Sequence, residues 1–143
     1  MSIVIEHLNY VYMQGGPYET KALDDVSLTI HDGEFVGLIG HTGSGKSTLV
    51  QHLNGLILPT SGQITVDGMD LADKNTDKRA IRRRVGLVFQ YPENQLFEET
   101  VAKDIAFGPK NLGLDEAEID RRVRTAMRRV ALDYDKLSQR SVF

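Results

Sequence analysis

The sequence predicts an α/β fold in which an antiparallel β region precedes a buried strand, a glycine-rich loop and a helix. Three observations support this prediction. The first 30 residues alternate apolar and polar side chains, as strands with one solvated face do. The run FVGLI at 35–39 is apolar enough for a central strand, and the stretch after residue 46 places leucines at helical spacing. Between them lies GHTGSGKST, Gly40 to Thr48.

Length and composition restrict the classes of protein. A chain of 143 residues suffices for one domain with a sizeable core. Its 17 basic and 20 acidic residues give a formal net charge of -3, which provides no overall attraction to nucleic acid. Cysteine is absent, which excludes disulfides and thiolate sites. We expect no signal peptide from MSIVIEHLNY, and no apolar run approaches the roughly 18 residues of a membrane span.

The first predicted elements are strands. The early strand region has these apolar or aromatic positions: Ile3, Ile5, Leu8, Tyr10 and Tyr12. Gly15 to Pro17 interrupts it. A second strand alternates Val26, Leu28 and Ile30 with hydroxyl residues, and Asp32-Gly33 predicts a hairpin turn into the run 35–39.

After the glycine-rich loop, we expect a helix from about Lys46 that ends near Gly55 and Pro59. Ile64 and Val66 predict a short strand. The cation-rich stretch 78–84 is either a nucleic-acid patch or a solvated helical face. The second interpretation is favoured, because no aromatic residues interleave and the chain is acidic overall.

The remaining elements are a strand and two helices. Val85 to Phe89 predicts a second buried strand, followed by Gln90. A short helix from about Thr100 should stop at Gly108-Pro109. A longer amphipathic helix should follow Asp115, with i,i+4 pairs of Glu118 with Arg122 and of Asp120 with Arg124. Its apolar face is predicted to contain Ile119, Val123, Ala126, Met127 and Val130.

The loop fits the template GxxxxGK[ST], a cradle for phosphate groups. Its glycines would let backbone amides approach a triphosphate, while Lys46 reaches the β- and γ-phosphates and Ser47 ligates Mg²⁺. His41 occupies a variable position, so we interpret it as an exposed loop residue rather than a ligand. A chance match to a glycine-rich turn is disfavoured by the strand and helix predicted on either side.

Gln90 has two interpretations on position alone. It follows a predicted strand, and ligands of open α/β sheets bind beyond the carboxyl ends of the strands. It could equally be a polar residue that ends the strand.

Several segments together carry a resemblance to a known family. They are ALDDVSLTI, the loop, LNGL, PTSGQITVDG and VGLVFQYPENQLFEETVAKDIAFGP. They resemble the N-terminal half of an ABC transporter ATP-binding subunit. More narrowly, they are similar to the second of the paired ATPases of energy-coupling factor (ECF) transporters, which import vitamins and transition metals in prokaryotes. The resemblance implies a P-loop NTPase core with an N-terminal antiparallel β subdomain over 1–90 and the start of the helical subdomain over 91–143.

The resemblance also implies roles for residues. Tyr12 would stack on adenine, unless it is an ordinary strand tyrosine, and Gln90 would touch Mg²⁺ or the attacking water. Lys46 and Gln90 are thus the implied catalytic residues, and Ser47 and Gln90 the implied metal ligands. Phe97 and Phe107 would be core or contact residues in the region that meets the membrane subunit, with core favoured. The implied ATP-binding loop positions are Gly40, His41, Thr42, Gly43, Ser44, Gly45, Lys46, Ser47 and Thr48.

The implied setting is the cytoplasmic face of the cell membrane, where a peripheral ATPase would energise transport. The implied partners are a second ECF ATPase, a transmembrane T component and a substrate-binding S component, with no nucleic acid. The family's LSGGQ-type signature, Walker B Asp-Glu pair and switch His do not occur in the sequence. We therefore expect an N-terminal fragment that binds ATP with little hydrolysis. The alternative is a nucleotide-binding or interaction module that never hydrolyses ATP, whereas a kinase or GTPase is disfavoured.

Overall fold

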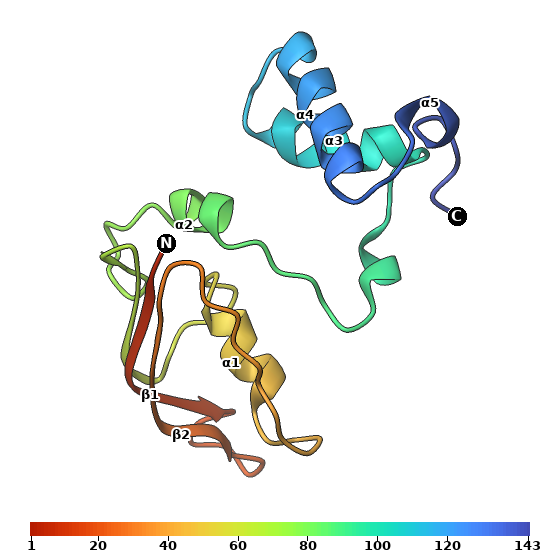
Figure 1. Cartoon of the computed structure of the whole chain (residues 1–143). Helices are drawn as coiled ribbons and strands as arrows, with labels where there is room; N and C mark the ends of the chain where they lie inside the picture. Colours follow the sequence, from red (N-terminus) through yellow and green to blue (C-terminus); the bar gives the residue numbers. More distant parts are fainter. The chain divides into compact units, whose positions relative to one another are not determined.

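A four-stranded sheet and two helices form the first of two units in the computed structural model, which describes residues 1–143 (Figure 1). The first unit is Met1–Leu87 and the second is Val88–Phe143. The first contains β1 (Ile3–Tyr12), β2 (Thr20–Ile30), α1 (Lys46–His52), β3 (Ser61–Val66), β4 (Met69–Asp70) and α2 (Lys78–Arg84). The second contains the 3₁₀ helix η1 (Pro92–Gln95), α3 (Val101–Asn111), α4 (Glu116–Arg129) and α5 (Tyr134–Leu137).

The sheet is antiparallel throughout, with strand order β2-β1-β3-β4. This confirms the predicted antiparallel N-terminal region and the short strand around Ile64 and Val66. The β1–β2 connection turns around Gly15 and Gly16, as the Gly-Gly-Pro stretch predicted. Ile3, Ile5 and Ile64 are buried, which places the inner face of the sheet against the core.

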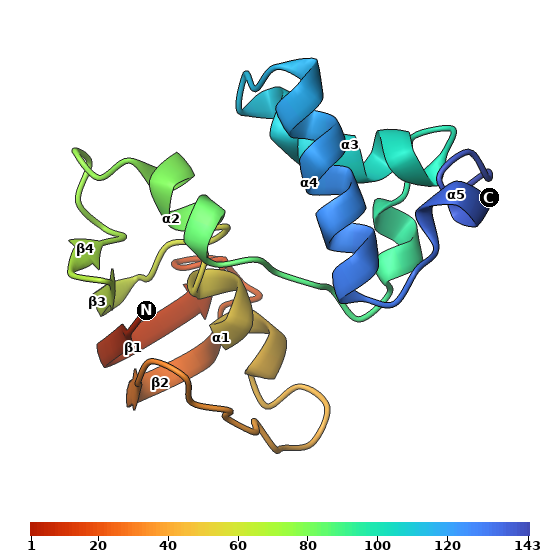
Figure 2. The ribbon, with the colours of Figure 1, turned by 45° about the horizontal axis from the view of Figure 1, so that its top comes forward.

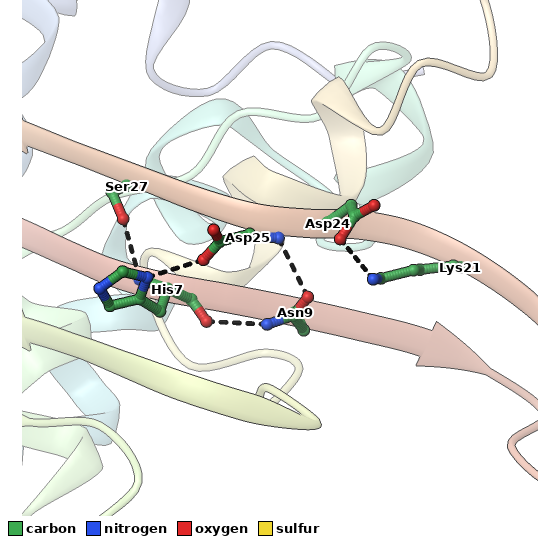
Figure 3. A network of polar contacts seen from close by, with 6 residues as sticks. All are labelled: His7, Asn9, Lys21, Asp24, Asp25 and Ser27. Atoms are coloured by element: carbon green, nitrogen blue, oxygen red, sulfur yellow. Dashed lines mark hydrogen bonds and ion pairs between the residues drawn. The ribbon is translucent and has the colours of Figure 1, made fainter.

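Two register shifts explain why the apolar positions of β1 are not strictly alternate. The β1–β2 pairing shifts between Ile5 and Leu8 and again between Leu8 and Tyr10. His7 and Asp25 take left-handed φ values of 49°, and their side chains meet at 2.7 Å between Nδ1 and Oδ1. Figure 3 shows this pair with Asn9 and Ser27, whose side chains bond the main chain at the same bulges. The bulges return Leu8 to the inner face.

Both helices of the first unit contribute to one hydrophobic core. Leu49 of α1 and Ile81 of α2 pack with residues of the sheet, and Figure 2 shows both helices beside it. The core consists of Ile3, Ile5, Leu8, Leu23, Leu49, Ile64, Val66, Leu71 and Ile81. On α2, Arg82, Arg83 and Arg84 remain exposed, in accordance with a solvated helical face.

The predictions of two buried strands are wrong. Residues 35–39 and 85–89 are not in a strand, and Phe35 and Ile39 are almost fully exposed. A turn does occur at Asp32-Gly33, but no hairpin follows it. The physical reason is that a strand requires a hydrogen-bonded neighbour, and neither run pairs with another strand of the chain.

The second unit is helical. Its core contains Ala106 of α3 with Val123 and Met127 of α4. The predicted pairs are present, with Arg122 and Arg124 bonded to Glu118 and Asp120 at 2.7 Å. The chain after α5 docks on the start of α3, where the Ala102 amide donates to the Ser138 carbonyl at 2.9 Å.

Several details of this unit differ from the predictions. Helix α3 continues past Gly108-Pro109, because the Leu112 amide still reaches the Gly108 carbonyl at 3.2 Å. Ala126 and Val130 are exposed, since α4 ends at Arg129 and only part of its surface faces α3. No helix of the chain combines the length and the apolar character that crossing a membrane requires.

Candidate nucleotide-binding site

The glycine-rich loop leads directly into α1, as predicted. Gly45 is the residue before the helix, with φ 89° and ψ 2°, and no side chain caps the helix start. Within the loop, the Ser44 amide donates to the His41 carbonyl at 3.2 Å. The first amides of a helix have no partner inside the helix, so those of α1 are available to an anion.

Gly45 is required by close approach as well as by conformation, and Gly40 lies close to the Ser44 side chain. A Cβ at Gly45 would lie 2.5 Å from the Ala22 carbonyl oxygen and 3.1 Å from Leu23 Cδ2. A Cβ at Gly40 would lie 2.5 Å from Ser44 Oγ. At Gly45 the loop is therefore backed by the main chain of β2, and only glycine allows this approach.

Lys46 is held inside the curve of the loop. Its Nζ donates to the carbonyls of Gly40 at 2.6 Å and His41 at 2.7 Å, with Ser44 Oγ at 3.4 Å. The ammonium group thus lies where the loop closes on itself. A phosphate bound there would meet a positive charge together with main-chain amides, a combination that suits a polyanion.

The side chains of His41 and Ser47 lie at the surface, whereas Thr48 is buried. His41 is exposed, and its Nδ1 bonds the Thr42 carbonyl at 2.8 Å, which matches the expectation of an exposed loop residue. Ser47 is also exposed, in the first turn of α1. Its hydroxyl is an oxygen ligand of the kind that Mg²⁺ prefers.

Tyr12, the last residue of β1, contacts the helix that follows the loop. Its hydroxyl lies 3.0 Å from Thr48 Oγ1, and its ring packs edge-on against Tyr10 with centroids 4.8 Å apart. The Tyr12 side chain remains 41% exposed. The structure thus brings Tyr12 to α1 while leaving part of the residue accessible.

Three residues of the second unit were predicted to have functional or core roles, namely Gln90, Phe97 and Phe107. Gln90 is exposed and lies just before η1, so its participation in the site remains a prediction. Phe97 and Phe107 pack edge-on with ring centroids 4.6 Å apart. Both residues are exposed, at 57% and 41%, so the favoured assignment of these rings to the core was wrong.

The sequence did not predict what supports the loop. The Ala22 carbonyl and the Leu23 side chain of β2 back Gly45. Both residues begin the segment ALDDVSLTI, but nothing in that segment indicates a contact with the loop. The sequence places His52 at helical spacing with Leu49, Leu53 and Leu56. The structure buries His52 completely and leaves Leu56 47% exposed. The available signal was a polar, titratable residue on an otherwise apolar helical face.

Comparison with known proteins defines the class. Residues 23–142 match the model of the ABC transporter family, so the chain belongs to that family. The chain is 61% identical over 143 residues to the energy-coupling factor transporter ATP-binding protein EcfA2 of Clostridium tetani, of which it covers 50%. This confirms the predicted resemblance to the second type of ECF ATPase. The chain spans about half the length of the curated relatives it matches.

Solved structures confirm the fold class. The chain superposes with a TM-score of 0.78 on cbiO1 from Clostridium perfringens, part of the ABC transporter complex cbiONQ. The identity is 38%, and the match covers 97% of this chain and 53% of that chain. The bacterial ABC transporter cassette MJ0796 gives the same TM-score of 0.78 at 25% identity, covering 97% of this chain and 61% of that one. The fold therefore corresponds to a little over half of an ABC ATPase cassette.

Proposed function

We propose that the chain carries the nucleotide-binding part of an ATPase subunit that energises an ECF-type importer of vitamins or transition metal ions. The observation that carries the proposal is the loop itself. Gly45 is backed by the Ala22 carbonyl, and Lys46 Nζ is enclosed by the loop carbonyls. The relatives are named as ATP-binding proteins of energy-coupling factor transporters, which supports a role in energising transport over a module that only binds nucleotide.

The loop would bind the triphosphate of ATP. Main-chain amides between Gly40 and Thr48 would face the phosphate oxygens, and Lys46 would exchange its carbonyl contacts for the β- and γ-phosphates. These contacts stabilise charge on the phosphates, which is the main requirement of phosphoryl transfer.

Mg²⁺ fits this site as a companion of the triphosphate. No group of three or more His, Asp or Glu side chains in the chain could hold a metal ion by itself. We propose that Ser47 and Gln90 would supply protein oxygens to a cation that arrives with ATP. When bound, Mg²⁺ neutralises charge on the phosphate oxygens.

Tyr12 would hold the base. A stacked aromatic contact contributes about 0.5–1.5 kcal/mol. The bond from its hydroxyl to Thr48 Oγ1, 3.0 Å long, would keep the ring near the helix that follows the phosphate loop. Gln90 would complete the catalytic arrangement by touching Mg²⁺ or the attacking water.

The setting of the complete transporter is also part of the proposal. We propose a heterodimer with a second ECF ATPase, bound to a transmembrane T component and a substrate-binding S component on the cytoplasmic face of the membrane. The relatives named for energy-coupling factor transporters support this, as does the similarity to a part of the cbiONQ complex.

Binding of a fluorescent ATP analogue tests the proposal. Lys46→Ala should weaken binding about tenfold or more, because a charge-assisted hydrogen bond contributes about 1.5–3 kcal/mol. Lys74→Ala, a substitution of an exposed lysine in the same unit, is the matched control and should bind normally. Equal binding by both variants would show that the phosphate site lies elsewhere.

A further inference from the structure

His52, in the last turn of α1, is an ionisable side chain that the fold buries completely, at 0% exposure. Its Nδ1 lies 2.7 Å from the Thr48 carbonyl oxygen. Because a carbonyl can only accept, Nδ1 must carry the hydrogen. Burial lowers the pKa of His52 below its ordinary value, against the opposing effect of the Thr48 and Leu58 carbonyls.

Nε2 is buried and has no hydrogen-bond partner. A buried polar atom without a partner carries a desolvation penalty that an apolar side chain of similar size would avoid. The imidazole thus costs stability at Nε2, while Nδ1 provides a bond to Thr48 that an apolar side chain cannot make. This pattern favours a positioning role over simple filling of the core.

His52 contacts both residues that hold Tyr12. One is Thr48, whose carbonyl accepts from His52 and whose hydroxyl meets the Tyr12 hydroxyl at 3.0 Å. The other is Tyr10, whose ring packs edge-on against His52 and against Tyr12, with centroids 4.8 Å apart in each pair. Tyr12, Thr48, His52 and Tyr10 therefore form a closed ring of contacts between the end of β1 and the body of α1.

We infer that His52 is a positioning residue that fixes Tyr12 relative to the phosphate loop, so that the base and the phosphates of one nucleotide meet a preassembled site. The inference rests on the proposed function, because it takes Tyr12 as the residue that receives the base. The connection runs through α1, which also carries Lys46 and Ser47. Such preassembly lowers the ordering cost of binding.

The test compares the affinities of the 143-residue chain for ATP and for tripolyphosphate, each with Mg²⁺. His52→Leu removes the Nδ1 donor and should weaken ATP binding about three- to tenfold, with tripolyphosphate affinity changed less than about twofold. His52→Asn, whose amide nitrogen can replace Nδ1, should recover part of the loss. Leu53→Ala controls for general loss of packing around α1, because Leu53 packs against the core outside the ring of contacts.

Equal losses for the two ligands in His52→Leu, or no loss for ATP, would overturn the inference. If His52→Leu does not fold, Tyr12→Phe decides, because it removes only the hydroxyl that meets Thr48. If this variant binds ATP more weakly but tripolyphosphate normally, the result supports the inference. Unchanged ATP affinity overturns it. A chain that binds neither ligand refutes the proposed function. If the unsubstituted chain binds both ligands, and Tyr12→Ala weakens ATP binding selectively but His52→Leu does not, the positioning role alone is refuted.

Discussion

Replacing Gly45 by alanine tests whether the loop depends on its close approach to β2. At φ 89°, an alanine occupies a left-handed conformation, which costs about 1–2 kcal/mol. Its Cβ would also lie 2.5 Å from the Ala22 carbonyl, whereas ordinary contact begins near 3.4 Å. Relief requires a backbone shift, and forcing extra volume into a packed site costs about 1–3 kcal/mol. Together these give about 2–5 kcal/mol.

The assay is urea unfolding of the first unit with linear extrapolation. Gly68→Ala is the matched control, because Gly68 has φ 77° and a Cβ added there would meet nothing within 4 Å. Its free energy of unfolding should fall only by the cost of placing alanine in the left-handed conformation, about 1–2 kcal/mol. Gly45→Ala should therefore be less stable than Gly68→Ala, and it should also bind ATP more weakly. Equal stability losses with unimpaired ATP binding in Gly45→Ala would refute the argument.

Three further predictions concern other residues. Tyr12→Ala should reduce the binding free energy of ATP by about 0.5–1.5 kcal/mol more than that of tripolyphosphate in a calorimetric titration. Equal losses for the two ligands would argue against adenine stacking. The Arg121 and Arg122 side chains hold the Glu118 pKa at about 2, below its ordinary 4.5, so its stabilising effect is present above pH 4.5 and is lost as the pH falls toward 2. Glu118→Gln should accordingly lower the melting temperature at pH 7 but not at about pH 2, and a difference independent of pH would contradict this. Met127→Ala should destabilise the second unit by about 2–5 kcal/mol, seen as faster amide exchange in α3 and α4, because Met127 is fully buried.

Local patterns predicted the elements that stabilise themselves with nearby partners. Strands β1 and β2 pair with one another across a short connection, and α4 carries its own N-cap at Asp115 and its own ion pairs. The loop was predictable because its template constrains backbone conformation within a few residues. In each case the relevant interactions are short in sequence, so the sequence pattern contains most of the information.

Features that depend on distant partners were not predictable. The runs 35–39 and 85–89 have the composition of buried strands, but strand formation depends on a neighbour that supplies hydrogen bonds. Likewise, the contact between Tyr12 and Thr48 joins residues far apart in sequence through the fold of β1 onto α1. The bulges at His7 and Asp25 are set by cross-strand contacts that spacing alone does not reveal.

The most direct test of the phosphate cradle is an amide NMR titration of the chain with tripolyphosphate and Mg²⁺. We expect the largest shifts on the amides of Gly43, Gly45, Lys46 and Ser47, and we expect Lys46→Ala to reduce them strongly at a ligand concentration near the Kd of the unsubstituted chain. Shifts centred instead on the exposed arginines of α2 or α4, with the loop amides unchanged, would contradict it.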